Sequence, residues 1–255
     1  MKEKNESALD LRGAVEFRRV SKKFGEHVVL DGVSFQVERG TAFCLLGKSG
    51  VGKSVTLKLT MGLLSPDSGD VLVQGERVHD LRPETLSALR RRMGFLFQQA
   101  ALFDSISVGE NVAFPLRRGG VPESEVRPRA EHKLEQVGLK GRYDAMPSEL
   151  SGGMKKRAGL ARALAMEPEV LLVDESSAGL DPITSAEIDE LLLRLKSGDG
   201  TTMMIVTHNI PSARRVGDRL ALLEGGKIQS EGTVEDLEHS DDELVRSFMQ
   251  SGSGG

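Results

Sequence analysis

The segment GKSGVGKS between Gly47 and Ser54 contains residues that could bind phosphate groups. It fits the pattern of a glycine, four variable residues, and then glycine, lysine and serine or threonine. In such a loop, backbone N–H groups point inward around phosphate oxygens, and the N-terminus of the next helix adds partial positive charge. The Lys53 ammonium then reaches the β- and γ-phosphates of a nucleotide, and the Ser54 hydroxyl is a ligand of Mg²⁺. The sequence therefore predicts a nucleotide-binding loop made of Gly47, Lys48, Ser49, Gly50, Val51, Gly52, Lys53 and Ser54.

Two adjacent acids, Asp174 and Glu175, follow the apolar run VLLV later in the chain. Because side chains alternate across a strand, two neighbouring acids at its end point in different directions. We therefore expect Asp174 to hold Mg²⁺ and Glu175 to orient or deprotonate an attacking water. A single acidic pair on its own would be an ordinary solvated turn. The preceding phosphate-binding loop is what favours the catalytic interpretation.

Two further segments could contact a phosphate. In LSGGM, Ser151 is expected to cap a helix, and the bare glycines Gly152 and Gly153 would leave its first N–H groups open to an anion. An ordinary capped helix is the alternative. His208 ends the apolar run TMMIVT, where a polar residue fits a γ-phosphate contact, although a lone histidine is more often structural.

The elements that must position these residues follow from the spacing of apolar side chains. Strands that alternate with helices predict an α/β fold with a mostly parallel sheet covered on both faces. Prolines recur in residues 108–165, and the elements that the spacing indicates there are helices, such as 129–137 and 152–166. We therefore predict a helical insertion at about 99–165. Strands are predicted within 15–37 and at 41–46, 93–97, 170–173 and 202–206, hairpins at 69–78 and 220–229, and further helices at 55–64 and 185–195.

The length and composition of the chain limit the classes of protein to which it could belong. The chain has 255 residues, which we read as a single domain over 13–250 followed by a flexible tail or linker at 251–255. Its net charge of −4 gives no whole-chain positive field to attract nucleic acid. The single cysteine, Cys44, excludes an internal disulfide framework, and the charged start favours a cytosolic chain. No uncharged run is long and apolar enough to span a membrane, so a membrane role requires a partner.

The order of the motifs resembles that of the ABC-type ATPases over nearly the whole chain. Gln98 follows a predicted buried strand within GFLFQQ, LSGGM precedes the acidic pair, AGLD ends at Asp181, and His208 comes last. Phe24 lies where an aromatic side chain of this family stacks on adenine, with a core aromatic as the alternative. The resemblance implies the ABC ATPase fold, with a P-loop RecA-like core, an antiparallel β element and a helical insertion. It also implies hydrolysis of ATP with Mg²⁺.

The same resemblance implies roles for individual residues. Gln98 would join Mg²⁺ and the water to the insertion, and the helix opened by Ser151 would meet a γ-phosphate held by a second protomer, so that a homodimer shares its sites. The predicted catalytic residues are Glu175, His208 and Gln98; the nucleotide-binding residues add Phe24, Ser151, Gly152, Gly153 and Asp181 to the P-loop; and the predicted metal ligands are Ser54, Gln98 and Asp174.

Integral-membrane permease subunits are the implied partners, and the cytoplasmic face of the inner membrane is the implied location of a peripheral subunit. Motion would pass to the permease through a groove between Gln98 and residues 100–115. The apolar residues 100–103 could line a socket for a partner helix. Alternatively, they pack the insertion on the core.

Departures from the commonest family motifs point to one branch. Met154 stands in place of glutamine, Ser176 in place of proline, and Lys48 at the second P-loop position, and none of these removes a catalytic group. LSGGM followed by KKR, together with GLDPITS and the C-terminal SDDELVR, resembles the Mla/Mce-associated branch. That branch energises lipid transport between bacterial membranes, with lipid-binding and regulatory subunits as further partners.

Other functions share the same catalytic motifs. The alternatives are an ATPase of an amino-acid type importer and a non-transport regulator of cell-wall hydrolases. ABC ATPases that act on DNA or ribosomes are disfavoured because this chain has one P-loop and no long coiled-coil insertion. We therefore expect no nucleic-acid partner.

Overall fold

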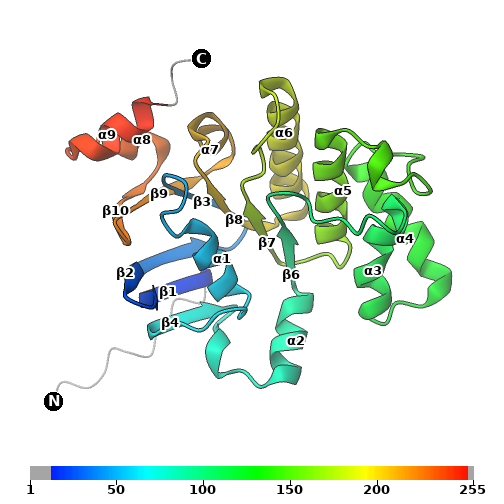
Figure 1. Cartoon of the computed structure of the whole chain (residues 1–255), viewed down its shortest axis with the longest axis horizontal. Helices are drawn as coiled ribbons and strands as arrows, with labels where there is room; N and C mark the ends of the chain where they lie inside the picture. The colour runs from blue at the N-terminus through cyan, green and yellow to red at the C-terminus, as the bar shows by residue number, and fades with distance from the viewer. Residues whose placement is uncertain (1–12, 252–255) are drawn as a thin grey trace.

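The computed structural model describes residues 13–251, so the predicted tail lies outside the described residues from position 252 onward. Its strands form two sheets (Figure 1). The smaller sheet is antiparallel, in the order β2-β1-β4-β5, and corresponds to the predicted antiparallel element. Its strands are β1 (Gly13–Phe24), β2 (His27–Glu38), β4 (Ser68–Val73) and β5 (Glu76–Arg77).

The larger sheet has the order β10-β9-β3-β8-β7-β6. All neighbours in it are parallel except β10, which pairs antiparallel with β9. With helices on its flanks, this mostly parallel sheet confirms the predicted α/β fold (Figure 1). Its strands are β3 (Ala42–Leu46), β6 (Met93–Leu96), β7 (Val170–Asp174), β8 (Thr202–Thr207), β9 (Arg219–Glu224) and β10 (Lys227–Gly232).

The strand β3 shows why the central strands read as continuous apolar runs. Ala42, Cys44 and Leu46 pack in the hydrophobic cluster under the helices, whereas Phe43 and Leu45 pack in a second cluster between the two sheets. All five are buried. Since neighbouring residues point to opposite faces of a strand, a sheet covered on both sides needs apolar residues at every position.

The helices cover the larger sheet and form the insertion. The insertion contains α3, α4 and α5, which lie together at one end of the molecule in Figure 1. The helices are α1 (Lys53–Thr60), α2 (Pro83–Arg91), α3 (Val108–Arg118), α4 (Glu123–Gln136), α5 (Gly152–Leu164), α6 (Pro182–Asp199), α7 (Ile210–Val216), α8 (Val234–Glu238) and α9 (Glu243–Gln250), with 3₁₀ turns at Val78–Asp80 and Pro147–Glu149.

Several helix boundaries differ from the predicted ones. The helix α1 begins two residues before the predicted start and ends at Thr60 instead of at 64. Proline does not end the helices of the insertion, because Pro115 lies inside α3 and Pro128 inside α4. A proline removes one backbone hydrogen bond. The buried faces of both helices, represented by Leu116 and Leu134, supply the packing that outweighs this loss.

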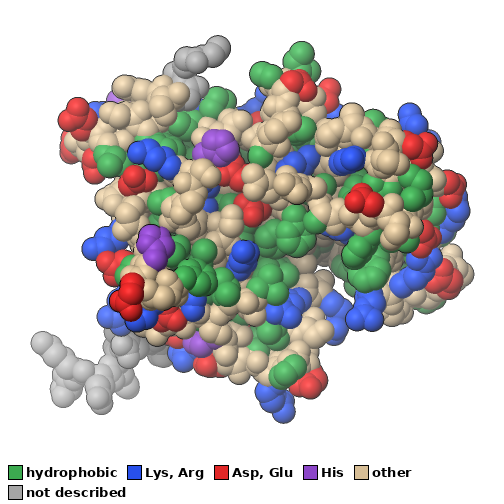
Figure 2. All heavy atoms as spheres, in the orientation of Figure 1, with side chains coloured by type: hydrophobic (Ala, Val, Ile, Leu, Met, Phe, Trp, Pro, Cys, Tyr) green, Lys and Arg blue, Asp and Glu red, His purple; other side chains and the backbone are tan. Residues whose placement is uncertain are grey.

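Exposed aromatic side chains gather where the insertion meets the core. Phe97, Phe103 and Phe114 each expose between 41 and 46% of their surface and line a groove of about 770 Å³. Arg91 and Arg118 line the same groove. Figure 2 shows apolar side chains in this region, with Lys and Arg side chains beside them. The molecule therefore has an apolar groove with basic side chains beside it.

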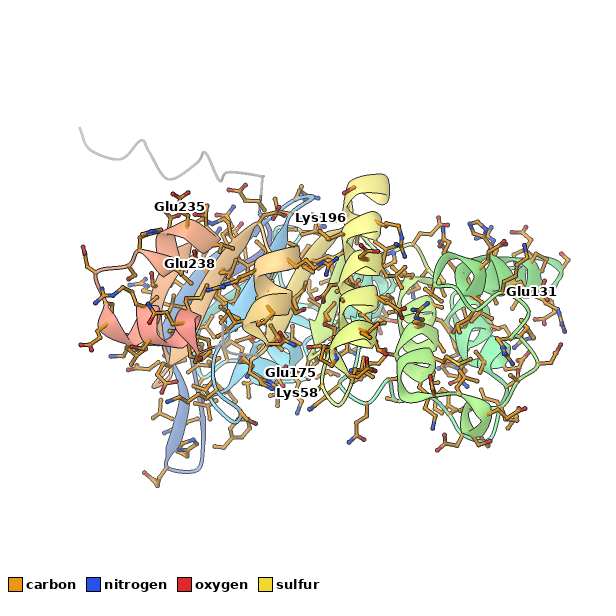
Figure 3. The ribbon with its side chains drawn as sticks, turned by 90° about the horizontal axis from the view of Figure 1, so that it is seen from above. Lys58, Glu131, Glu175, Lys196, Glu235 and Glu238 are labelled. Carbon is orange, nitrogen blue, oxygen red and sulfur yellow. The ribbon has the colours of Figure 1, made fainter. Side chains whose placement is uncertain are left out.

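Several predicted site residues lie together at the carboxyl ends of the parallel strands. The P-loop follows β3, Asp174 ends β7 with Glu175 directly after it, and His208 follows β8. The order β3-β8-β7 places these three ends side by side. Figure 3 shows Glu175 in the central part of the molecule, away from Glu131 at the outer end of the insertion. A site at the carboxyl ends of parallel strands is the usual place for a ligand in this class of sheet.

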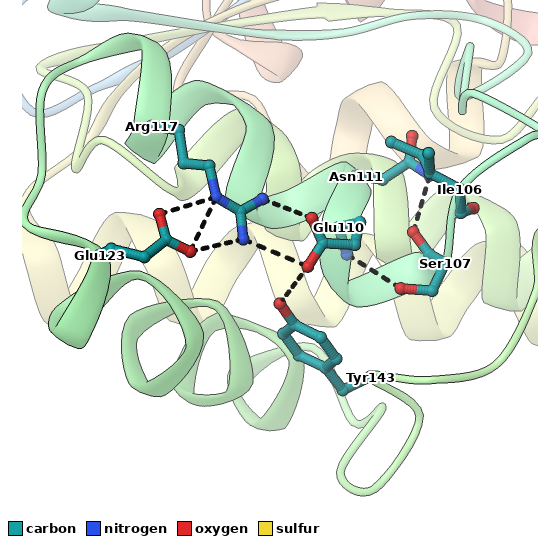
Figure 4. Close-up of polar contacts among 7 residues, drawn as sticks. All are labelled: Ile106, Ser107, Glu110, Asn111, Arg117, Glu123 and Tyr143. Atoms are coloured by element: carbon teal, nitrogen blue, oxygen red, sulfur yellow. Dashed lines mark hydrogen bonds and ion pairs between the residues drawn. The ribbon is translucent and has the colours of Figure 1, made fainter.

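A polar network joins the helices of the insertion (Figure 4). Arg117 on α3 hydrogen-bonds to the Glu110 carboxylate and donates through Nε to both Glu123 oxygens, at 3.0 and 3.1 Å. The Tyr143 hydroxyl donates to Glu110 Oε1 at 2.8 Å. The hydrogen bond from Arg117 holds the pKa of Glu110 below its ordinary value. Ionised Glu110 is therefore part of what fixes α3 against its neighbours.

Candidate active site

The P-loop has the backbone that its glycines allow. Gly50 and Gly52 have φ angles of +81° and +112°, in the region that side chains other than hydrogen disfavour. A Cβ atom at position 52 would lie only 2.7 Å from Val29 Cγ1. Among residues 13–251, no side chain caps the N-terminus of α1, which begins at Lys53. The N-terminal N–H groups of α1 are thus available to an anion.

Lys53 lies across the loop that precedes it. Its Nζ donates to the carbonyl oxygens of Gly47 and Lys48, at 2.7 and 3.0 Å, and lies 3.3 Å from Glu175 Oε1. Only 5% of Lys53 is exposed. A buried ammonium with movable donors beside an anion-binding loop is suited to neutralise phosphate. Phosphate would compete with the Glu175 carboxylate for this ammonium.

Ser54 and Asp174 supply the oxygen atoms expected of a magnesium site. The Ser54 hydroxyl donates to Asp174 Oδ1 at 3.0 Å. Burial raises the pKa of Asp174, against the lowering effect of the Ser54 hydrogen bond. The described residues hold no cluster of three or more His, Cys, Asp or Glu side chains that could bind a metal. One hydroxyl and one carboxylate nevertheless fit Mg²⁺, which keeps several waters and takes other ligands from phosphates.

The Glu175 carboxylate is held by donors from the end of β8. Its Oε2 accepts hydrogen bonds from Thr207 Oγ1 at 3.1 Å and from His208 N at 3.2 Å, and lies 2.9 Å from His208 Nδ1. Burial raises the pKa of Glu175, but the hydrogen bond from His208 and the charge of Lys53 outweigh it, so that the pKa lies below its ordinary value. Glu175 is therefore an ionised, oriented carboxylate that could accept a proton.

A cleft of about 360 Å³ brings many of the predicted residues together. Phe24 stands at this cleft with 48% of its surface exposed, as an aromatic side chain free to stack would be. The predicted residues that line the cleft are Phe24, Ser49, Gly50, Gly52, Lys53, Ser54, Gln98, Glu175 and His208.

Other predicted residues lie outside this lining. Ser151 caps α5 by accepting a hydrogen bond from Met154 N at 3.3 Å, and Asp181 caps α6 by accepting from Ile183 N and Thr184 N, both at 3.0 Å. Both are thus placed at helix starts, as expected for Ser151. The predicted residues that do not line the cleft are Gly47, Lys48, Val51, Ser151, Gly152, Gly153, Asp174 and Asp181.

Some residues at the site were not predicted from the sequence. His27, Val29 and Val55 also line the cleft, and none of them belongs to a predicted motif. The register of the first hairpin places His27 opposite Phe24, which is a signal that could have indicated it. Thr207 binds Glu175 and precedes His208 at the end of β8. In the sequence, a hydroxyl at that strand end is a weaker indication of function, because Thr207 contributes to the site only by its hydrogen bond to Glu175 on the neighbouring strand end.

Comparison with known families decides the family. A family model described as ABC transporter matches residues 30–178. The chain belongs to the ABC transporter family. As a member, it is the ATP-binding and ATP-hydrolysing subunit of a transporter, which confirms the predicted ATPase activity. None of the helices in the described part of this ABC ATPase combines the length and apolar character needed to cross a membrane.

Relatives of this ABC ATPase act on different cargoes. It is 42% identical over 243 residues to the methionine import ATP-binding protein MetN of Caulobacter vibrioides, covering 94% of this chain and 73% of that protein. It is 39% identical over 242 residues to the intermembrane phospholipid transport system ATP-binding protein MlaF of Haemophilus influenzae, covering 94% of this chain and 92% of that protein. Similarity to MlaF agrees with the predicted branch.

A solved structure supports the fold. The ATP-binding cassette MJ0796, in a dimeric post-hydrolysis state bound to ADP and phosphate, aligns with a TM-score of 0.78 and 35% identity. The alignment covers 86% of this chain and 98% of that one. The ABC ATPase fold that the motif order implied is thus confirmed.

Proposed function

We propose that this ABC ATPase energises the transport of phospholipid between bacterial membranes. The similarity to MlaF over nearly the whole of both chains carries the proposal. The motifs LSGGM-KKR, GLDPITS and SDDELVR support the same branch. The protein would act as a peripheral subunit at the cytoplasmic face of the inner membrane, together with permease, lipid-binding and regulatory subunits. Amino-acid import is a second candidate, favoured by the comparable similarity to MetN.

The site supports a direct attack of water on the γ-phosphate of ATP. The P-loop N–H groups and Lys53 would bind the β- and γ-phosphates, and Phe24 would stack on the adenine. Ser54, Asp174 and Gln98 would hold Mg²⁺, which neutralises phosphate charge when bound.

Glu175 then acts on the water. Its carboxylate accepts a proton while the water oxygen bonds to the γ-phosphorus and the bond to the ADP oxygen breaks. His208, 2.9 Å from Glu175 Oε2, would keep the carboxylate in place and contact the γ-phosphate. Since Lys53 is bound to Glu175 before ATP arrives, phosphate binding would release the carboxylate for this task.

A homodimer would complete the site. The cleft at Lys53 takes no lining residue from the described segment 151–153, which opens α5 in the same chain. A second copy could bring its Ser151 segment, with the N-terminal dipole of its α5, to the exposed side of the nucleotide. The dimeric MJ0796 structure with ADP and phosphate supports such an arrangement.

Mixing two inactive variants tests the shared site. Lys53→Ala and Ser151→Arg each break both sites of a homodimer, but a mixed dimer keeps one site made only of wild-type elements. With free exchange about half of the dimers are mixed, so ATPase activity should recover to roughly a quarter of wild type if the sites act independently. Confirmed mixed dimers without recovered activity would contradict independent shared sites.

The groove beside the insertion is the proposed contact with the permease. Of the predicted socket, Ala101 and Phe103 line the groove, whereas Ala100 is buried. The ring centroids of Phe103 and Phe114 lie 5.2 Å apart, which gives the groove an aromatic wall. A short apolar helix of the permease would bury these rings.

A transport assay separates the candidate functions. The complex that contains this chain should be isolated from its native membrane and placed in vesicles with labelled phospholipid or labelled methionine. The proposal predicts ATP-dependent phospholipid transfer, which Glu175→Gln abolishes, and no methionine uptake. Methionine uptake without lipid transfer would establish the importer instead. Movement of neither cargo by an active ATPase would favour the cell-wall regulator.

A further inference from the structure

The helix α5 carries a buried lysine that faces the catalytic strand. Only 4% of Lys156 is exposed, and its Nζ donates to the main-chain oxygen of Glu175 at 2.9 Å. Among residues 13–251 this ammonium forms no ion pair. Most other buried positions of α5 hold alanine, leucine or glycine. Burying a charge is costly, so a lysine here needs a specific reason.

The backbone of Glu175 offers that reason. Glu175 has a φ angle of +50°, a left-handed conformation that residues other than glycine keep only where their surroundings impose it. Its N–H donates to Val206 O at 2.9 Å, and its carbonyl also accepts from Ala178 N at 3.2 Å. Lys156 supplies the charged bond among these three, and charge-assisted bonds are the stronger kind.

The carboxylates of the site act on this lysine through their charge. Glu175 is paired with Lys53 at 3.3 Å, and the charges of Asp174 and Glu175 both favour the protonated form of Lys156. Burial lowers the pKa of Lys156 to about 8, while the charges of Asp174 and Glu175 act in the opposite direction. Lys156 is therefore mostly protonated at neutral pH. Its ammonium can bind the carbonyl of Glu175 as a cation.

Helix α5 also binds a second segment whose backbone is left-handed. Arg162 donates through Nη2 to Ala100 O and through Nη1 to Ala101 O, both at 2.7 Å. Ala100 and Ala101 have φ angles of +59° and +48°, and they follow Gln98 in the chain. Helix α5 thus binds both loops that carry predicted catalytic side chains. In each case a cationic side chain of α5 donates hydrogen bonds to main-chain carbonyl oxygens of the loop.

We propose that Lys156 is a positioning residue for ATP hydrolysis. Its ammonium holds the left-handed main chain of Glu175, so that the carboxylate points toward the attacking water. Because Lys156 belongs to α5, the orientation of Glu175 depends on how α5 is seated against the core. The proposal rests on the proposed role of Glu175 as proton acceptor and adds a residue that neither the motif order nor the cleft lining indicates.

The first test is Lys156→Met, which keeps the volume of the side chain and removes the charge and the donors. In the complex isolated from its native membrane, kcat should fall about 10- to 100-fold, as expected for loss of a charged hydrogen bond to a buried group. KM for ATP should change by less than about 2-fold, since Lys156 does not line the nucleotide cleft. Lys156→Arg, which keeps the charge, should recover most of kcat.

A matched control measures the cost of losing any buried lysine. Lys133 on α4 is 8% exposed and pairs with Glu167 at 3.3 Å, away from the catalytic strands. Lys133→Met should leave kcat near the wild-type value. An equal loss of kcat in both methionine variants would overturn the positioning role. If Lys156→Met does not fold, Lys156→Gln keeps a donor without the charge and is held to the same kcat and KM criteria.

A double-variant comparison separates this proposal from the role of Glu175. In the Glu175→Gln background, measured in single-turnover experiments, Lys156→Met should cause little further loss, because its target no longer accepts a proton. A full additional loss would show that Lys156 acts elsewhere and would refute the inference. Normal turnover in Glu175→Gln alone would instead refute the proposed role of Glu175. Wild-type kcat in Lys156→Met beside an inactive Glu175→Gln would refute only the role of Lys156.

Discussion

The replacement Glu175→Gln separates the chemistry of the site from its binding of nucleotide. Glutamine has the shape of glutamate but cannot take a proton from water at neutral pH. Loss of general-base catalysis should lower kcat by about 10²- to 10⁴-fold, equivalent to about 2.7–5.5 kcal/mol. ATP affinity should rise, because Lys53 is no longer neutralised by a carboxylate 3.3 Å away and is free for phosphate.

The hydrogen-bond geometry also predicts a cost in stability. Donors from Thr207 and His208 converge on Oε2 of Glu175, so the amide oxygen of glutamine should take that position. Its NH₂ group then faces the Lys53 ammonium, which places two donors against each other. Such a mismatch costs about 1–3 kcal/mol in the free energy of unfolding. Lys53 keeps its bond to the Gly47 carbonyl, so the P-loop should stay folded.

Three measurements on one preparation test this reasoning. Single-turnover hydrolysis gives the chemical rate, a fluorescent nucleotide gives Kd, and calorimetry gives Tm. Glu235→Gln is the control, because Glu235 lies on α8, away from Glu175 (Figure 3). A rate within about 10-fold of wild type would contradict proton transfer to Glu175. Weaker ATP binding would contradict the competition between phosphate and carboxylate for Lys53.

Two further predictions concern the insertion. Gly109→Ala would place a Cβ atom 2.2 Å from Tyr143 Cγ, so this variant should lose about 1–3 kcal/mol of stability and have a lower Tm. The control Gly198→Ala has open space around its Cβ position and should keep the wild-type Tm. An unchanged Tm in Gly109→Ala would contradict the close packing of Gly109 on Tyr143. Because the Arg117 hydrogen bond holds the pKa of Glu110 below the ordinary 4.5, Glu110 contributes stability above that pH and loses it as the pH falls through the folded-state value. Glu110→Gln should therefore be less stable than wild type at pH 7 and lose less stability on acidification to pH 3, and parallel acid unfolding curves would contradict this.

Local sequence determined the phosphate-binding loop. The φ angles of Gly50 and Gly52 are accessible to glycine at little cost, and the first turn of α1 follows directly. The uninterrupted apolar run of β3 likewise indicates a strand buried on both faces, with alternate side chains in the two hydrophobic clusters. In the loop and the first turn of α1, the interactions that fix the backbone span only a few residues, such as the hydrogen bond from Val55 N to Gly52 O. Motif order alone was therefore enough to indicate the family and its fold.

Helix boundaries in the insertion needed information from outside each segment. Pro115 and Pro128 are unfavourable inside a helix when the segment is considered alone. In the structure, the buried faces of α3 and α4 pack against each other and against α5. The packing between these helices stabilises them by more than the loss of one backbone hydrogen bond costs. The sequence of one helix does not reveal which helix packs against it.

Only the tertiary structure decided what surrounds Glu175. The sequence placed this carboxylate at the end of a strand. Its donors Thr207 and His208, however, lie at the end of β8 and just after it, and its main-chain partner Lys156 lies on α5. The left-handed backbone of Glu175 is likewise a property of the packed site, since an isolated glutamate disfavours it. The local sequence is enough to identify the residue types that do the chemistry. Their orientation and charge state depend on groups that folding brings from distant parts of the chain.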